Sequence, residues 1–514
     1  MMLQGHTYSA ICLLLSLSIL AVSPSAEEYS QLWGKNGELW SADSRLPDFS
    51  HAGYHRGEKP VPEIAVTANV RDFGAVGDGE HDDTQAFLDA IRQTSQGAIL
   101  VPAGRYKITD IIEIEKPNIV LRGESPDNTI LYFPINLNDI RPNWGATTGG
   151  RKTSNYSWSG GFIWLRGSFQ SSLLVKDMEE AKRGDTQIVV SDSSRLQEGQ
   201  LIEIRVTDND DNTLADHLYS GDPGEVSELR GRTRASLVAT VLSINDKTIT
   251  IDRPLRFDLQ SQWNPQIYSY SPTVQEVGIE NLCFEFPVEK YDGHFTELGH
   301  NALAMSSVAN CWVRNIRIVN PDSGLFIGGK FNTINGVIFE SERPPDNSNN
   351  TGHHGIYIST DDNLFNGFDF RMRFIHDISV SHCAGNVISN GRGMDLCFDH
   401  HKRAPYENLF TNIDLGAGTR MWRSGGGADL GRHCGARGTF WNIRAKQPQA
   451  HPGSFGPASM NLVGVQTRRS SITEPEGIWF EAIAPDILSP QNLHKAQLAR
   501  RLNRATSIKD PLMR

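Results

Sequence analysis

The chain has 514 residues, a formal net charge of −11 and 47 glycines. Its length allows one very large domain or two to three ordinary ones, and its composition is that of a globular protein with many turns. An acidic chain is a poor candidate for general nucleic-acid binding, so we expect no nucleic-acid partner.

The N-terminus has the pattern of an export signal. Residues 10–22 form an apolar stretch that only serine interrupts, and it is too short to span a bilayer but suits the core of a signal peptide. Ser23, Ser25 and Ala26 offer small residues for a cleavage site, although no Lys or Arg precedes the apolar stretch. A buried N-terminal helix is the alternative. We expect residues 1–26 to be a signal peptide, the protein to be secreted or periplasmic, and no segment to span a membrane.

The next segments predict an irregular lead and then a short helix. Residues 27–69 are rich in Pro, Ser and aromatic residues, and we expect them to drape over the domain that follows. Residues 70–91 predict a strand, a glycine turn and a helix that begins near Asp82 or Asp83. The apolar stripe of this helix consists of Ala86, Phe87, Ala90 and Ile91.

Two strand–turn–strand patterns follow this helix, and together with it they resemble a known family. DFGAVGDGEHDDTQAF (72–87), followed by ILVPAGRYKI (99–108) and IVLRGE (119–124), resembles the N-terminal signature of the pectate-lyase-like superfamily of right-handed parallel β-helices. The resemblance implies an all-β solenoid whose first part, with a capping helix, spans residues 70–180. That superfamily includes polysaccharide lyases, hydrolases, epimerases and phage tailspikes, so the resemblance implies a fold rather than one substrate.

A second group of strands interrupts this pattern. Alternating strands with hairpin turns over residues 181–256 predict an inserted β module, which either walls one side of a cleft or decorates the solenoid. From Val277 a repeat begins in which Asn or Asp precedes an alternating strand, as in a solenoid. We assign the main coils, with the active cleft, to residues 257–446, and a C-terminal extension and cap with a helix from about Pro490 to residues 447–514. The repeat anchors, which we expect at coil corners, are Asn281, Asn315, Asn335, Asn366, Asp377, Asn412 and Asn442.

The cysteines indicate neither a disulfide framework nor a zinc site. Cys12 lies in the expected signal, and the others are odd in number, widely spaced and without a CxxC motif. We therefore expect buried thiols. They are Cys283, Cys311, Cys383, Cys397 and Cys434.

Charged and aromatic residues gather in the stretch MDLCFDHHKR (394–403). Its first eight residues alternate with period 2 and predict a strand with one buried face. Segments 352–359, 374–377 and 418–441 would stack near it, because residues at one position of successive coils form rows along a β-helix. The expected inner residues are Met394, Leu396, Phe398 and His400, and the expected outer ones are Asp395, Cys397, Asp399 and His401.

The histidines of these segments have two interpretations. With Ile356 and Ile358 inside, His353 and Tyr357 point outward and are free to contact a ligand. Others fall on the inward parity, where a hydrogen-bonded core histidine is the alternative to a catalytic one. These are His354, His376 and His400.

The same region carries excess positive charge. From Arg392 to Lys446 there are nine Lys or Arg against five Asp or Glu, a local net charge of +4, which predicts one defined anionic ligand. β-Elimination of a uronic acid needs a positive group for the C5 carboxylate, a base for the C5 proton and an acid for the departing O4. We predict catalytic roles for His354, His376, Arg392, His400, His401 and Arg403. We predict substrate-binding roles for His353, Tyr357, Tyr406, Arg420, Trp422, Arg423 and Arg437.

Calcium is a candidate cofactor. Some lyases of the superfamily that this chain resembles neutralise the carboxylate with Ca²⁺ held by acidic residues, which implies Asp395 and Asp399 as its ligands here. Alternatively, these carboxylates orient His400 or His401 through an Nδ1–H group. No other cofactor is expected.

These observations predict a secreted, monomeric polysaccharide lyase that acts on an anionic, uronic-acid-containing polysaccharide. The stretches GHHGI (352–356) and HHKRAPYENLFTN (400–412) are also similar to a polysaccharide lyase-like subgroup of secreted β-helix proteins, but this resemblance implies no residue roles. A uronate epimerase would share the first step, and a non-catalytic glycan-binding solenoid is a further alternative. A glycoside hydrolase would need two carboxylates, for which the pairs are Asp361 with Asp362 and Asp395 with Asp399.

Overall fold

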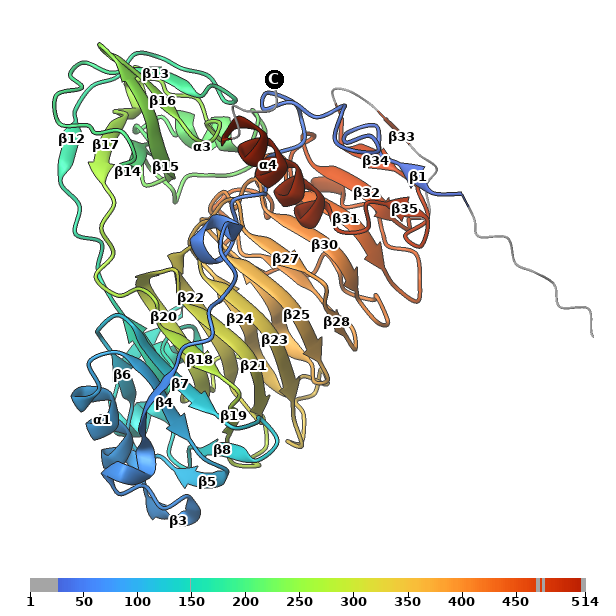
Figure 1. The fold of residues 1–514 in the computed structure, drawn as a ribbon. Coiled ribbons are helices and arrows are strands. Elements are labelled where there is room, and N and C mark those ends of the chain that lie inside the picture. Colours follow the sequence, from blue (N-terminus) through green and yellow to red (C-terminus); the bar gives the residue numbers. More distant parts are fainter. Residues whose placement is uncertain (1–25, 148, 468–471, 474–476, 510–514) are drawn as a thin grey trace, which may run out of the picture.

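The chain winds into a parallel β-helix, as the sequence predicts (Figure 1). The computed structural model describes residues 26–147, 149–467, 472–473 and 477–509. The predicted signal peptide, apart from its last residue, lies outside these described residues. Two parallel sheets run along the solenoid, and we call them the front sheet and the back sheet.

The front sheet carries the segments that the sequence marked as chemically interesting. Its strands pair in parallel, each with the equivalent strand of the next coil. In order they are β6 (Ile112–Ile114), β11 (Ile163–Arg166), β20 (Asn301–Ala309), β22 (Ser323–Lys330), β24 (Gly352–Ile358), β26 (Phe374–Val380) and β29 (Phe398–His400).

The back sheet is longer and bends, so that most coils contribute two short strands or one bent strand to it. Its N-terminal strands are β2 (Val66–Asn69), β3 (Asp78–Asp82), β4 (Gly97–Val101), β5 (Gly104–Lys107), β7 (Ile119–Gly123), β8 (Thr129–Tyr132), β18 (Gly278–Glu280) and β19 (Cys283–Glu285). The later strands are β21 (Trp312–Val319), β23 (Thr333–Glu340), β25 (Leu364–Phe370), β27 (Val387–Ser389), β28 (Arg392–Gly393), β30 (Leu409–Asp414), β31 (Thr439–Arg444), β32 (Asn461–Val465), β33 (Ile472–Thr473) and β34 (Trp479–Glu481).

The solenoid interior is apolar and continuous along the axis. The inward residues of both sheets form one buried cluster of Ile, Val, Leu and Phe side chains. Aromatic rings stack from coil to coil, as with Phe339 on Phe370, whose ring centroids lie 4.4 Å apart. Each coil therefore covers the apolar face of its neighbour, which is the source of stability in a solenoid. The cysteine prediction also holds, since every cysteine in the described part of the chain is a buried free thiol.

Asparagines mark the bend in the back sheet. Asn281, Asn315 and Asn412 have φ of 57°, 52° and 57°, in the left-handed region that asparagine tolerates. Asn315 Nδ2 donates to Asn281 Oδ1 at 2.8 Å, so these anchors bond to the side chain of the next coil rather than to its backbone. Asp377 was expected in this series, but it lies in the front sheet and its carboxylate accepts from Arg420.

The inserted module is an antiparallel sheet beside the solenoid (Figure 1). It extends from Leu173 to Ser269, beyond both ends of the predicted 181–256. Its apolar core includes Ala384, Ala404 and Tyr406 of the solenoid, which anchor it to the coils. Its strands are β12 (Leu173–Val175), β13 (Gln187–Val189), β14 (Leu201–Thr207), β15 (Arg234–Asn245), β16 (Thr248–Ile251) and β17 (Gln266–Ser269).

Short helices and the N-terminal segment complete the fold. In helix α1 (Thr84–Gln93) the predicted apolar stripe is buried, and Asp83 precedes its first turn. Helix α4 (Leu493–Lys509) packs with Trp33 and Phe49 of the N-terminal segment against the last coils. The remaining elements are α2 (Leu137–Ile140), α3 (Thr213–Leu218), the hairpin β9 (Trp144–Ala146) with β10 (Lys152–Ser154), and β1 (Glu28–Tyr29) with β35 (Leu488–Ser489). Among the described residues, no helix combines the length and apolarity that crossing a membrane requires.

The stretch MDLCFDHHKR is not the single strand that its alternation predicts. Met394 is 59% exposed and Cys397 is buried, the reverse of their expected positions. The reason is that β28 ends at Gly393 in the back sheet and β29 begins at Phe398 in the front sheet, so the residues between them turn a corner. The predicted inner positions of Leu396, Phe398 and His400 are confirmed, whereas the positions predicted for Met394 and Cys397 are wrong.

Candidate functional site

The site begins with a row of polar side chains across the front sheet. Tyr357, Ser379 and Asp399 occupy the same position of three successive coils, paired in register on β24, β26 and β29. They alternate with core residues such as Ile378 and Phe398, so they face outward. A row of this kind is what the sequence predicts for a β-helix.

Asp399 is the centre of this row. Its Oδ2 accepts from Ser379 Oγ at 2.8 Å and contacts Nδ1 of His401 at 2.9 Å and Nδ1 of His376 at 3.2 Å. Its Oδ1 accepts from the Gly425 backbone N–H at 2.7 Å. Burial alone would raise the pKa of the Asp399 carboxyl, but these neighbours hold it below its usual value. The carboxylate is therefore ionised and orients two imidazoles.

His354 and His376 join the outer face despite their inward parity. A Cβ on Gly355 would lie 2.3 Å from the ring of Phe370 in the solenoid interior, so Gly355 takes the inward position. Simple alternation therefore breaks at Gly355, and His354 points outward. Its ring stacks on that of His376, with centroids 5.0 Å apart. His354 Nδ1 lies 3.3 Å from Ser379 Oγ, which ties it to the Asp399 row.

Burial keeps most of this cluster neutral. It lowers the pKa of His376 below the usual histidine value, and it lowers the pKa of His353 and His354 well below that value, with the other imidazoles adding to the effect. Burial also raises the pKa of the Tyr357 hydroxyl. The ring of His401 is 29% exposed and lies 6.1 Å, centroid to centroid, from that of Tyr357. A proton acceptor and a proton donor therefore stand side by side at the surface.

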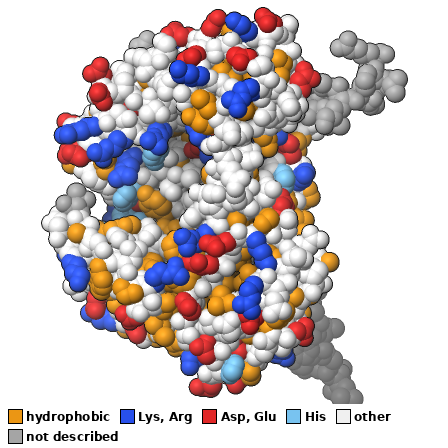
Figure 2. Space-filling view, turned by 90° about the vertical axis from the view of Figure 1, so that its left-hand side faces the viewer, with side chains coloured by type: hydrophobic (Ala, Val, Ile, Leu, Met, Phe, Trp, Pro, Cys, Tyr) orange, Lys and Arg blue, Asp and Glu red, His pale blue; other side chains and the backbone are white. Residues whose placement is uncertain are grey.

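Two arginines flank the cluster. Arg423 lies near enough to His376 and His294 to lower their pKa, and Arg403 lies near enough to Tyr357 to affect its hydroxyl. Both are exposed, and within the described part of the chain neither has a carboxylate partner. Figure 2 shows histidine side chains in a hollow on this face, with Lys and Arg side chains along one edge. The hollow therefore offers positive charge to an anionic ligand.

Other predicted residues lie away from this cluster. Arg392 is on the back sheet, where it pairs with Asp369 at 2.8 Å. His400 is fully buried among Phe410, Phe440 and Phe455, which matches the alternative of a core histidine. These positions offer no contact with a ligand in the hollow, because a wall of coil backbone separates the interior and the back sheet from it.

Four further predicted positions have structural roles. Arg420 is buried and bonds Asp377 at 2.6 Å, and Arg437 bonds Glu407 at 2.6 Å. Trp422 donates its Nε1–H to a backbone oxygen and packs on core phenylalanines, so it offers no open stacking platform. Tyr406 is buried beneath the module.

The donor set around Asp399 does not fit calcium. Ca²⁺ takes six to eight oxygen ligands, whereas Asp399 is surrounded by imidazole nitrogens and its oxygens are already in contact with donors. Asp395 bonds the Thr419 backbone and hydroxyl instead and belongs to another part of the turn. Calcium dependence stays a prediction.

Sequence reasoning missed two residues beside the cluster. His294 lies in the loop before β20 and its ring is 4.5 Å from that of His353. Glu297 is buried behind His353, with Oε1 3.5 Å from its Nδ1, and burial raises the Glu297 pKa to about 7. No repeat or motif marks this loop, so only the fold could place it here.

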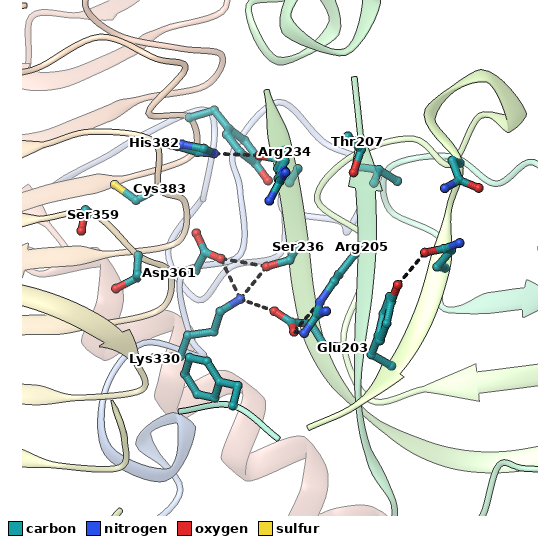
Figure 3. Close-up of a pocket in the computed structure, with 18 residues that line it drawn as sticks. Glu203, Arg205, Thr207, Arg234, Ser236, Lys330, Ser359, Asp361, His382 and Cys383 are labelled. Atoms are coloured by element: carbon teal, nitrogen blue, oxygen red, sulfur yellow. Dashed lines mark hydrogen bonds and ion pairs between the residues drawn. The ribbon is translucent and has the colours of Figure 1, made fainter. Parts of the chain in front are cut away.

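A second cavity, of about 410 Å³, lies between the module and the front sheet (Figure 3). Lys330 at its base bonds Glu203 of the module at 2.9 Å and Asp361 of the solenoid at 3.0 Å. The neighbouring Asp362 is buried in a pair with Arg253. Asp361 and Asp362, the first pair considered for a hydrolase, are thus both neutralised by cations. The module does wall a cavity, as one of its two interpretations expects.

A family model described as "Rhamnogalacturonase A/epimerase, pectate lyase-like" matches residues 67–224. The chain is 32% identical over 116 residues to the plasmin and fibronectin-binding protein A of Streptococcus pneumoniae (strain ATCC BAA-255 / R6), a match that covers 20% of this chain and 15% of that protein. It is 31% identical over 100 residues to alginate lyase 7 of Azotobacter vinelandii, covering 18% of this chain and 12% of that enzyme. The chain thus matches only a small share of the length of these relatives.

Solved structures are similar in fold at low identity. The tailspike protein gp49 from Pseudomonas phage LKA1 aligns with 79% of this chain and 68% of its own, at 15% identity and a TM-score of 0.41. The family match and the observed coils fit the pectate-lyase-like superfamily of parallel β-helix proteins. A polysaccharide-modifying enzyme, alginate lyase 7, is among these relatives.

Proposed function

We propose that the protein is an exported, monomeric polysaccharide lyase that cleaves a uronate-containing glycan by β-elimination. The observation that carries the proposal is the group of Asp399, His401 and Tyr357 beside Arg403 and Arg423, which have no carboxylate partner among the residues that the structure describes. This set supplies the three functions that β-elimination needs on one face of the solenoid.

The base in this proposal is His401. Asp399 holds its Nδ1 at 2.9 Å, which leaves Nε2 as the nitrogen that accepts the C5 proton. The buried carboxylate also stabilises the imidazolium that forms. A base that is oriented by a hydrogen-bonded carboxylate is a common arrangement in catalysis.

The acid is Tyr357. A tyrosine hydroxyl is protonated at neutral pH, and burial raises the pKa of Tyr357 further, so it can donate to the departing O4. The Tyr357 and His401 rings are neighbours, with centroids 6.1 Å apart, so both could reach one sugar unit bound over them, the imidazole at C5–H and the hydroxyl at O4. Arg403 and Arg423 would bind the C5 carboxylate and so make the C5 proton more acidic.

The cluster supports elimination better than hydrolysis. A glycosidase needs two carboxyl groups within reach of the scissile bond, and the outer row contains only Asp399, which is fully buried. Epimerisation shares the removal of the C5 proton and differs in the fate of the carbanion. The match to a family model that includes an epimerase makes this the second outcome to measure.

The test is to mix the purified protein with a panel of uronate polysaccharides and follow the ultraviolet absorbance of the 4,5-double bond. A rise with one polymer supports the lyase. New reducing ends without a rise would move the function to hydrolysis. The same assay with and without a calcium chelator tests calcium dependence.

A further inference from the structure

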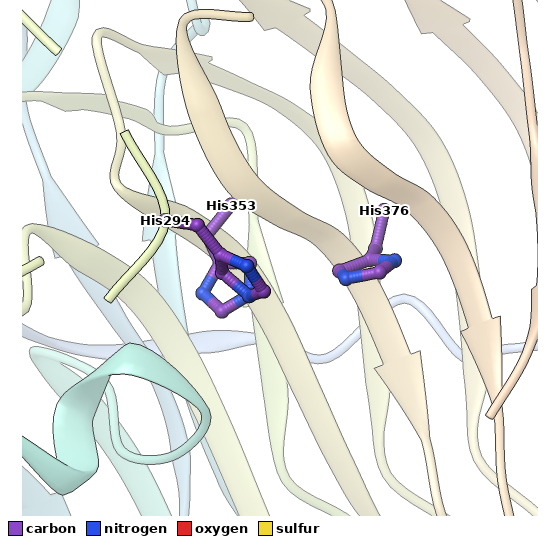
Figure 4. A group of neighbouring side chains, drawn as sticks. All are labelled: His294, His353 and His376. Atoms are coloured by element: carbon purple, nitrogen blue, oxygen red, sulfur yellow. The ribbon is translucent and has the colours of Figure 1, made fainter. Parts of the chain in front are cut away.

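Three imidazoles come together from separate segments of the chain (Figure 4). His294 comes from the loop before β20, His353 from β24 and His376 from β26, and one ring nitrogen of each lies within 4.8 Å of the others. Their ring centroids are 4.5 to 5.8 Å apart. These three residues are called the imidazole triad below.

Carboxylates stand behind two members of the triad. Nδ1 of His353 lies 3.5 Å from Glu297 Oε1, and Nδ1 of His376 lies 3.2 Å from Asp399 Oδ2. Histidines that bind metals characteristically place their second ring nitrogen against a carboxylate, which fixes the tautomer and makes the ligating nitrogen more basic.

Packing alone does not account for this arrangement. His353 and His376 are 2% and 6% exposed, and neither Nδ1 makes a hydrogen bond of good geometry. Buried polar atoms without good partners are costly, and their partners in folded proteins are normally found. A cation bound by one ring nitrogen of each residue would give these buried imidazoles a partner.

We propose that His294, His353 and His376 bind a divalent transition-metal ion of the zinc class, with an open coordination position toward the hollow. Imidazole nitrogen suits zinc and not calcium or magnesium. Three histidines with a fourth position left open are a ligand set of catalytic rather than structural zinc sites.

The open position would take a carboxylate oxygen of the uronate, and this part of the inference rests on the proposed function. His376 contacts the same Asp399 that orients His401, so an ion on the triad would lie next to the base. A cation there would neutralise the C5 carboxylate together with Arg423.

The test measures zinc content of the full-length protein, made without a histidine tag, after equilibration with Zn²⁺ and removal of the free ion. We expect one zinc ion per chain in the wild type. His294→Ala should weaken zinc binding at least about tenfold, and it should fold because His294 is exposed in a loop. His81→Ala, an exposed histidine on β3, is the matched control and should bind zinc as the wild type does.

The wild type binding no zinc, or His294→Ala binding it equally well, would overturn the site. The carboxylate part is tested with Co²⁺ in place of zinc, because added glucuronate should change the visible spectrum of the Co²⁺-loaded wild type. An unchanged spectrum would overturn that part. Zinc binding without any reaction on uronate polymers would uphold the site and contradict the proposed function, whereas lyase activity in a protein that binds no zinc would do the reverse.

Discussion

The front and back sheets of this solenoid both carry rows of charged side chains, but the rows differ in how they are paired. On the back sheet Arg317 bonds Glu340 at 2.7 Å, and Arg371 bonds Asp369 at 3.0 Å. In both pairs the positive charge meets a negative charge from its own or a neighbouring coil. On the front sheet the cluster around Asp399 has more cationic and imidazole groups than carboxylates.

This difference explains what the positive charge of the region means. The local excess between residues 392 and 446 is divided among three environments. Arg392 is in the paired back-sheet row, Arg420 is buried in a structural pair, and Arg403 and Arg423 are left for a ligand. A count of charges along the sequence predicts an anionic ligand, but pairing across coils decides which residues can bind it.

The largest effect should come from removing the base. His401→Ala should lower kcat by about 10²–10⁴-fold, the usual contribution of a general base. The measurement is the initial rate of double-bond formation on the polymer that the wild type cleaves. Arg392→Ala, on the opposite face, is the matched control and should keep the wild-type rate. Equal losses in both variants would break the distinction between the two sheets.

The ion-pair network around Lys330 should contribute to stability rather than to activity. Lys330→Met leaves the half-buried Asp361 without its cation and the buried Glu203 with Arg205 alone, and it should lower the free energy of unfolding by about 3–5 kcal/mol. Urea denaturation measures this change. Lys290→Met, an exposed residue in a surface pair, should change it by less than about 1 kcal/mol.

The same network should make the free energy of unfolding depend on pH. Burial would raise the Glu203 pKa, but Lys330 and Arg205 lower it to about 2. A lowered pKa means that this stabilisation is fully present above the unfolded value of about 4.3 and is lost as the pH falls toward 2. Wild-type stability should therefore decrease over this window more steeply than that of Glu203→Gln. Parallel pH profiles would contradict the network's role.

The carboxylate behind the base should have a smaller effect than the base itself. Asp399→Asn keeps the shape but loses the charge that orients His401, and it should reduce kcat by about 10–100-fold with little change in KM. A change confined to KM would mean that Asp399 only shapes the hollow. The melting temperature of the variant serves as the folding control.

The smallest effect is expected for the back-sheet row. Arg371→Ala removes an exposed partner of Asp369 and Glu340 and should lower the free energy of unfolding by about 0.2–1 kcal/mol, with no effect on activity. Loss of activity in this variant would place part of the site on the back sheet.

The sequence predicts the solenoid and much of the cluster because both depend on local alternation. Strand parity correctly turns Tyr357 and Asp399 outward, and the row between them follows from coil stacking. It fails where the backbone departs from a regular strand. Gly355 shifts the parity of the histidines before it, and the corner between β28 and β29 exposes Met394.

Partners across coils and loops could not be predicted in the same way. Arg420 and Arg437 carry the same charge as Arg423, and only the folded chain shows that the first two are held by Asp377 and Glu407. His294 reaches the cluster from a loop with no periodic pattern. Such contacts depend on the three-dimensional path of the chain rather than on local spacing.

The most direct test of the account uses the intact uronate polymer on which the wild type acts. This polymer is treated in D₂O with the wild type or with His401→Ala, and C5 is followed by nuclear magnetic resonance. The account predicts that the wild type removes the C5 proton and forms unsaturated chain ends, and that His401→Ala does so far more slowly. Deuterium at C5 without unsaturated ends would indicate an epimerase that uses the same base. Cleavage with the C5 proton retained would contradict the account.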